Sequence, residues 1–333
     1  MDIDKIINDE TQFLALTGLY LSEFDELLTT FKPRWNQAFK HYDIRGKRRK
    51  KPLTPTQISK DTTSLPGALI KLFFILHHFK VNAIQQSEAM SFNITQPQVS
   101  RWIKLLTPIL HQSIVDLHLQ AARTSDELIR LFRNRQRDDS AVSKPATTTL
   151  NADGTDRPLS RNVDYKAQKF DYSGKQKTHT IKNTVICDEL QFIHFLGYTW
   201  RGAIHDKTMI EIELPDFNHP IFEQQTLLKD TGYQSYEPTG VKTLQPMKKK
   251  PKIDLTTLQK KFNTWISSHR VVVENAIGGV KYLRTLTDRT RGFRLEKFDD
   301  AIQIGVGLHN FRVTRRQTTY SGTLDRMRAN FLS

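Results

Sequence analysis

Cysteine is nearly absent from this 333-residue chain, in which Cys187 is the only one. A single cysteine excludes an intrachain disulfide and a metal site built from cysteine pairs. It suits a reducing compartment, so we expect a cytoplasmic protein, associated with the nucleoid if the host is a prokaryote. Long apolar runs are missing too: the longest covers residues 72–76, whereas a membrane-spanning helix needs about 20 residues. The acidic, polar start (MDIDKIINDE) predicts no secretory signal.

Acidic residues are too few to balance the basic ones, since 35 Asp and Glu face 50 Lys and Arg and leave a net charge of +15 at pH 7. This surplus favours a phosphate-rich partner, with nucleic acid ahead of an anionic membrane surface or a simple gain in solubility. The basic residues are also clustered. The runs that we expect to contact DNA contain Arg45, Lys47, Arg48 and Arg49, and then Lys248, Lys249 and Lys250.

A polar segment without apolar periodicity, residues 133–149, is interpreted as a linker. Apolar residues before it have helical spacing. Short apolar runs after it, broken by Gly, Asp and Asn, are typical of strands. The predicted order is therefore an N-terminal helical and basic segment (1–64), an all-helical domain (65–132), the linker, a mixed α/β domain (150–315) and a C-terminal tail (316–333).

The all-helical domain has the pattern of a helix-turn-helix. Helical spacing predicts a helix over 65–79, a short helix over 83–90 and a turn at 91–94. Thr95 and Gln98 then fit a capping box, which predicts a further helix from residue 96.

The polar face of this capped helix carries Gln98, Arg101 and Lys104. Glutamine and arginine side chains can hydrogen-bond to base edges in a major groove, so we predict that this helix reads DNA. An ordinary three-helix bundle with a solvated polar face is the alternative.

Two aspartates hold equivalent places in the α/β domain. Asp153 follows a predicted strand and precedes a glycine turn, and Asp230 follows a strand over 226–229 in the same way. Strands over 179–187 and 192–200 and a helix over 207–214 lie between them. A strand meander, a helix and a fourth strand beside the first is the order of the ribonuclease H fold. The two carboxylates could then share divalent metal ions.

A third carboxylate is expected from a helix that begins near residue 255. Arg270, Glu274 and Lys281 fall on one face of this helix. A glutamate on the apolar side is costly to bury unless it is paired or binds metal. Three carboxylates suit Mg²⁺ or Mn²⁺, and two such ions about 4 Å apart would activate the attacking oxygen and stabilise the leaving oxygen of a phosphodiester. A structural ion pair of Glu274 with Arg270 or Lys281 is the alternative.

Five motifs in this order resemble those of DDE transposases, specifically the insertion-sequence family numbered five and its PIF/Harbinger relatives. The upstream helix-turn-helix pattern also resembles that family, so the resemblance spans about residues 65–312. The motifs are DGTDRP (153–158), YSGKQKTHTIKN (172–183), GAIHD (202–206), DTGY (230–233) and an R-(3)-E-(6)-K signature made by Arg270, Glu274 and Lys281.

The resemblance implies a ribonuclease H-like catalytic domain preceded by a helix-turn-helix domain. Its catalytic and metal-binding residues would be Asp153, Asp230 and Glu274, with two Mg²⁺ or Mn²⁺ ions. The sequence departs from the family at Ser267, where the signature has tyrosine, and at Asp156, where glutamate is common.

The implied activity is that of a DNA transposase. It would bind the inverted repeats at the ends of its element, hydrolyse phosphodiester bonds and join the 3′-hydroxyl ends to target DNA. A homodimer or a larger oligomer on double-stranded DNA would bring two ends together. A non-catalytic DNA-binding protein or repressor derived from a transposase is the rival interpretation.

Asp206 competes with Asp230 for the second catalytic position, but a short helix follows it and no strand beside the first precedes it. We therefore favour Asp230. The residues expected to support the site are Asp206, His205, His179, Lys182, Arg270 and Lys281. For each histidine alone, an ordinary structural role is the competing interpretation.

Overall fold

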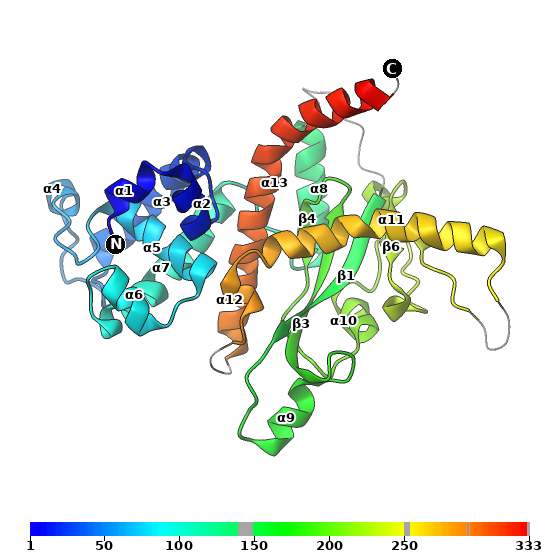
Figure 1. Ribbon diagram of the computed structural model, residues 1–333. Helices are drawn as coiled ribbons and strands as arrows, with labels where there is room; N and C mark the ends of the chain where they lie inside the picture. The colour runs from blue at the N-terminus through cyan, green and yellow to red at the C-terminus, as the bar shows by residue number, and fades with distance from the viewer. Residues whose placement is uncertain (139–148, 250–253, 291, 293, 332–333) are drawn as a thin grey trace. The chain divides into compact units, whose positions relative to one another are not determined.

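The computed structural model describes residues 1–138, 149–249, 254–290, 292 and 294–331 (Figure 1). Lys250 and most of the expected linker lie outside the described residues. The chain forms two compact units. The helical unit comprises Met1–Gln120, Lys281–Asp288 and Asp300–Arg315, and the sheet unit comprises the described parts of Ala121–Val280, Arg289–Asp299 and Arg316–Ser333.

These units do not follow the expected boundaries. Residues on both sides of position 65 share one core, because Phe13 packs against Phe73 and Trp35 against Trp102, with ring centroids 5.7 and 5.8 Å apart. Helix α8 (Ser125–Asp138) was expected in the helical domain. It belongs to the sheet unit instead, where its apolar face packs into the core beneath the sheet.

The helical unit is built from seven helices before residue 120, together with α12 (Arg284–Thr287) and part of α13 (Leu295–Phe331). The apolar run at residues 72–76 lies in a helix buried on nearly all sides. The seven helices are α1 (Ile3–Ile7), α2 (Glu10–Thr17), α3 (Leu21–His41), α4 (Pro55–Ser59), α5 (Gly67–Val81), α6 (Gln85–Ser91) and α7 (Gln96–Asp116).

The helices predicted over residues 65–79, over 83–90 and from residue 96 are confirmed as α5, α6 and α7. The capping box at the start of α7 is also present, and the Thr95 amide donates to Oε1 of Gln98 at 2.8 Å. This contact gives one orphan amide of the helix start a partner. The side chain of Gln98 is therefore engaged by its own helix.

The described residues of the sheet unit form seven strands. Five follow the order β2-β3-β1-β6-β7, and β4 and β5 also pair with β3. β3 runs antiparallel to β1, whereas β6 is parallel to both β1 and β7. The predicted fourth strand therefore does lie beside the first. The strands are β1 (Thr149–Pro158), β2 (Tyr172–Ser173), β3 (Thr178–Asp188), β4 (Ile193–Leu196), β5 (Trp200–Arg201), β6 (Thr226–Lys229) and β7 (Lys242–Leu244).

The single strand predicted over 192–200 is wrong, because the structure divides it into β4 and β5. The pairing with β3 shifts register between Ile186 and Cys187. A Cβ at Gly197, between the two short strands, would overlap the Glu213 carboxyl group, so this close approach of Glu213 requires a glycine. The short elements β2, β7 and α9 (Tyr165–Asp171) were not predicted.

Different helices cover the two faces of the sheet. Leu150 and Ala152 of β1 pack in one hydrophobic cluster with Ile210 of α10 (Asp206–Glu213) and with Tyr233, in the short 3-10 turn η3 (Thr231–Tyr233). A second such turn, η2 (Pro220–Phe222), precedes β6. Helix α11 (Thr257–Val280) packs on β1, β3 and β6 and crosses them in Figure 1. Successive side chains of a strand alternate between faces, so Asp153 and Gly154 point in opposite directions.

None of the helices in the described ranges combines the length and the apolar composition that crossing a membrane requires.

Candidate active site

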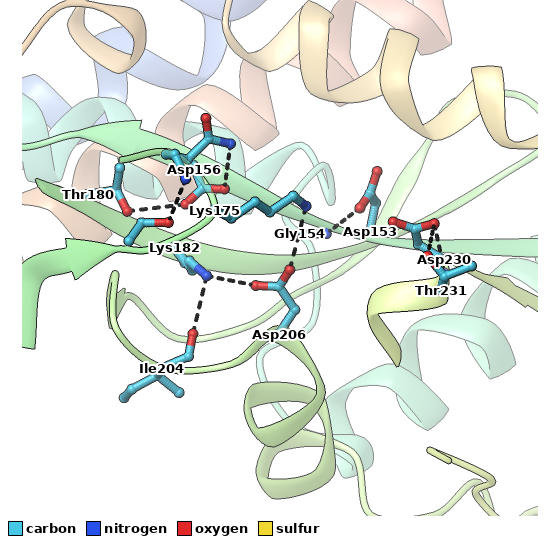
Figure 2. Close-up of polar contacts among 12 residues, drawn as sticks. Asp153, Gly154, Asp156, Lys175, Thr180, Lys182, Ile204, Asp206, Asp230 and Thr231 are labelled. Atoms are coloured by element: carbon cyan, nitrogen blue, oxygen red, sulfur yellow. Dashed lines mark hydrogen bonds and ion pairs between the residues drawn. The ribbon is translucent and has the colours of Figure 1, made fainter. Parts of the chain in front are cut away.

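The parallel pairing of β1 with β6 brings Asp153 and Asp230 side by side. The last paired residues of the two strands are Ala152 and Lys229, and each aspartate is the next residue along the chain. Figure 2 shows the two carboxylates close to each other. Each accepts a hydrogen bond from the following backbone amide, Asp153 from Gly154 at 2.8 Å and Asp230 from Thr231 at 2.7 Å.

Arg270 of α11 bridges the two aspartates. Its Nη1 donates to Oδ1 of Asp230 at 3.1 Å, and its Nη2 donates to Oδ2 of Asp153 at 3.3 Å. The side chains of Arg270, Asp153 and Asp230 are 12%, 19% and 29% exposed. The alternative that Arg270 pairs with Glu274 is thus wrong, because the guanidinium turns towards the sheet.

The environment of Asp153 disfavours an uncompensated negative charge. Burial raises the pKa of Asp153 above its ordinary value, and the neighbouring charge of Asp230 raises it further. The Arg270 guanidinium and the Gly154 amide act in the opposite direction but do not outweigh burial. A group whose charged form is disfavoured gains from a nearby cation, so the site favours positive charge between the two aspartates.

The sequence predicts Glu274 on the buried side of its helix, and this prediction is wrong. It is exposed, whereas Val273 and Ala276 carry the contact of α11 with the rest of the unit. Helix α11 ends at Val280, so Lys281 lies beyond it and is not part of the predicted face. Within the described ranges, no three His, Cys, Asp or Glu side chains are gathered closely enough to hold a metal ion.

Asp206 approaches the same strand from the opposite face. It is the first residue of α10, and a Cβ added at Gly154 would lie 3.3 Å from its Cγ. The glycine therefore makes this close approach possible. The buried Lys182 donates to Asp206 at 3.0 Å and to the carbonyl of Ile204 at 3.2 Å, as Figure 2 shows. Asp206 is thus paired with a lysine, whereas Asp153 and Asp230 share Arg270.

The other supporting candidates lie apart from the carboxylates. His205 is exposed at the start of α10, and His179 packs edge-on against Tyr172 with ring centroids 5.8 Å apart. Asp156 accepts a hydrogen bond from the Thr180 hydroxyl at 3.1 Å. Within the described ranges, none of these residues forms a hydrogen bond or an ion pair with Asp153 or Asp230.

Tyr233 is a site residue that sequence reasoning missed. Its side chain is buried, and its hydroxyl has no hydrogen-bond partner in the described part of the chain. Burial and the charges of Asp153 and Asp206 raise the pKa of Tyr233. Its place in the motif that begins at Asp230 was visible in the sequence, but its direction was not, because η3 turns the ring beneath the sheet.

The candidate DNA-contacting residues occupy several surfaces. In the helical unit, Arg101 and Lys104 are exposed on α7, while Gln98 is engaged in the cap. Arg45, Lys47 and Arg48 are exposed in a loop that a bridge between Tyr42 and Arg48 closes, and Arg49 stacks on Phe39. In the sheet unit, Lys248 is exposed and Lys249 pairs with Asp254 at 2.6 Å.

Comparison with known families bears on these carboxylates. Residues 152–310 match the DDE superfamily endonuclease family. The matched segment contains Asp153, Asp230 and Glu274. The resemblance seen in the sequence is therefore confirmed at the level of the DDE superfamily, whereas the relation to the insertion-sequence family numbered five and to PIF/Harbinger stays a prediction.

One known protein is similar to about half of this chain. The chain is 28% identical over 162 residues to a protein named "Probable transposase for insertion sequence element IS702", from Microchaete diplosiphon. The similar region covers 48% of this chain and 56% of the relative, so the chain spans about half the length of that relative. No solved structure matches this chain.

Proposed function

We propose that this protein is a DDE-type DNA transposase, a metal-dependent nuclease and strand transferase. The parallel register of β1 and β6 carries the proposal, because it sets Asp153 beside Asp230 within the segment that matches DDE endonucleases. Adjacent acids on neighbouring strands are what a shared divalent cation requires.

The sheet unit is, in this proposal, a ribonuclease H-like domain. The sheet supports it: β3 pairs antiparallel with β1 on one side and carries β4, while β6 on the other side of β1 is parallel to it and is followed by β7. The sequence predicts the same order, in which a strand meander and a helix precede a fourth strand beside the first. The proposal assigns α6 and α7 to a helix-turn-helix.

Two Mg²⁺ or Mn²⁺ ions would be held by Asp153, Asp230 and Glu274. The two aspartates fit such ions, because they offer hard oxygen ligands and already hold a cationic guanidinium between them. Glu274 comes four residues after Arg270, so it leaves α11 on the same side as Arg270 and is free of burial. When bound, the ions would activate the attacking oxygen and stabilise the leaving oxygen of a phosphodiester.

The chain's own residues have separate tasks in this mechanism. The Gly154 and Thr231 amides each hold one oxygen of an aspartate, which fixes the orientation of the carboxylate. Water and then a DNA 3′-hydroxyl would be the nucleophiles, so no covalent bond between protein and DNA is needed.

Double-stranded DNA, as element-end inverted repeats and as target, would be the partner, and two ends would be held by a dimer or a larger oligomer. Exposed Arg101 and Lys104 support base contacts by α7, and the exposed basic residues at 45–48 support phosphate contacts. Gln98 is withdrawn from the proposed base contacts, because its amide oxygen serves the helix cap.

The test uses full-length protein and a plasmid that carries the gene with its native flanking DNA. Mg²⁺-dependent nicking at the ends of the element is expected, with loss of nicking but not of gel-shift binding in Glu274→Gln. Exposed Lys261 on the same helix supplies a matched control, Lys261→Met, which should cleave as the wild type does. Binding without cleavage by the wild-type protein, with either metal, would instead identify a non-catalytic DNA-binding protein.

A further inference from the structure

The Arg270 guanidinium lies between the two carboxylates to which the proposed function assigns a cation. Its two Nη groups reach one oxygen each of Asp153 and Asp230, and all three side chains are largely buried. Two carboxylates and one guanidinium leave a formal charge of −1 in this cluster. A divalent cation would cancel the charge of both aspartates, whereas the guanidinium cancels only half of it.

We propose that Arg270 is a resident counter-ion that competes with divalent cations for Asp153 and Asp230, so that metal binding displaces its guanidinium. This inference rests on the proposed function, because it takes the metal site of that function as given. It assigns Arg270 a positioning role: the residue keeps the two carboxylates together in the metal-free protein and sets the affinity for metal.

The contacts of Arg270 suit a side chain that can leave. Its two ion pairs, at 3.1 and 3.3 Å, are longer than the roughly 2.7–2.9 Å of a strong charge-assisted hydrogen bond. Its Nε is buried and has no hydrogen-bond partner in the described part of the chain. In the described part of the chain, the guanidinium donates to no backbone carbonyl and to no third side chain, so displacement would break two long contacts.

Mn²⁺ binding to the DNA-free, full-length protein tests the competition by calorimetry. Arg270→Met removes the charge and keeps the alkyl stem, so the Kd for Mn²⁺ should fall about 5- to 30-fold if each lost ion pair is worth about 0.5–1 kcal/mol. Arg270→Lys retains the charge but cannot bridge two carboxylates with a planar fork, so its Kd for Mn²⁺ should lie between those of the wild type and Arg270→Met. Lys261→Met removes an exposed charge from the same helix and should leave the Kd unchanged.

A thermal measurement separates this role from a purely structural one. Arg270→Met should unfold at a lower temperature than the wild type in EDTA, and Mn²⁺ should raise its midpoint by more than it raises that of the wild type. A merely structural arginine would lower the midpoint equally with and without metal. If Arg270→Met does not fold without metal, the Kd of Arg270→Lys decides, and a value equal to or weaker than the wild-type one overturns the proposal.

An aspartate variant separates failure of the counter-ion role from failure of the proposed metal site. Mn²⁺ binding that is lost in Asp153→Asn but is not tightened in Arg270→Met overturns the counter-ion role and leaves the proposed function standing. Mn²⁺ binding that is absent from the wild type, or that persists in Asp153→Asn, overturns the metal site and the counter-ion role with it.

Discussion

Asp153→Asn should stabilise the metal-free protein even though, in the proposed function, it removes a metal ligand. The aspartate is 19% exposed, and burial raises the pKa of its carboxyl group above the ordinary 3.8 despite the nearby guanidinium. Asparagine has nearly the same shape, and its side-chain oxygen can still accept the hydrogen bond from the Gly154 amide. The substitution therefore removes a disfavoured charge and retains the local hydrogen bond.

The magnitude follows from the contacts that change. The substitution loses one partly buried ion pair to Arg270, which contributes about 0.5–1 kcal/mol. It relieves the repulsion from Asp230, which is of similar size, and it removes the desolvation cost of a charge with little exposure to water. The net gain is about 1 kcal/mol, or a rise of about 2–4 °C in the unfolding midpoint of a domain of this size.

Urea and thermal unfolding of the full chain in EDTA measure this effect, and pH supplies an internal control. An acid with a raised pKa binds protons more tightly in the folded state, so its cost to stability is absent below 3.8 and develops as pH rises through the folded pKa. The advantage of Asp153→Asn should thus vanish towards pH 3.8, grow as pH rises above it and be complete above the folded pKa of Asp153. A loss of 1 kcal/mol or more at pH 7 would show that the ion pair outweighs burial and refute this reasoning.

Three further predictions concern other parts of the chain. Arg101→Ala should cost about 1–3 kcal/mol on the inverted repeat and little on random duplex, whereas Lys249→Ala should weaken both and reduce the salt slope by about one; equal losses for Arg101→Ala would exclude base reading. Gly240→Ala should lower the free energy of unfolding by about 2 kcal/mol or more, because φ is +84° and a Cβ would overlap the backbone carbonyl of Phe217. Gly174→Ala, whose Cβ would enter open space, should cost little in the same unfolding assay. Burial lowers the pKa of Lys80 to about 8, so the free energy of unfolding should increase as pH rises from about 8 to 10.5 and the buried positive charge is lost. Lys80→Met should abolish this increase, and a variant with the same pH profile as the wild type would contradict the prediction.

Local patterns predicted most of the regular structure. Helical spacing and the capping pair located α5, α6 and α7, and short apolar runs located β1, β3 and β6. These elements could be read from the sequence because their signal lies within one turn or one strand. β2, β5 and β7 have only two or three residues each, and such short strands exist through their pairing with neighbours.

Domain boundaries depended on contacts between distant segments. Composition could not show that the helices before residue 65 share a core with α5 and α7, or that α8 packs beneath the sheet. Burial is decided by which apolar faces meet, and several pairings of faces are compatible with one sequence pattern.

For the site, the sequence alone determined which acids are candidates and that Asp153 and Asp230 follow equivalent strands, since both facts are local. Only the tertiary structure decided their surroundings: the parallel register that aligns them, the bridge made by Arg270, the exposed position of Glu274 and the approach of Asp206 beneath Gly154. Residue spacing states which side chains share one face of an element. The charged group that each side chain contacts on a neighbouring element depends on tertiary packing, because the cost of burying a charge competes with the gain from pairing it.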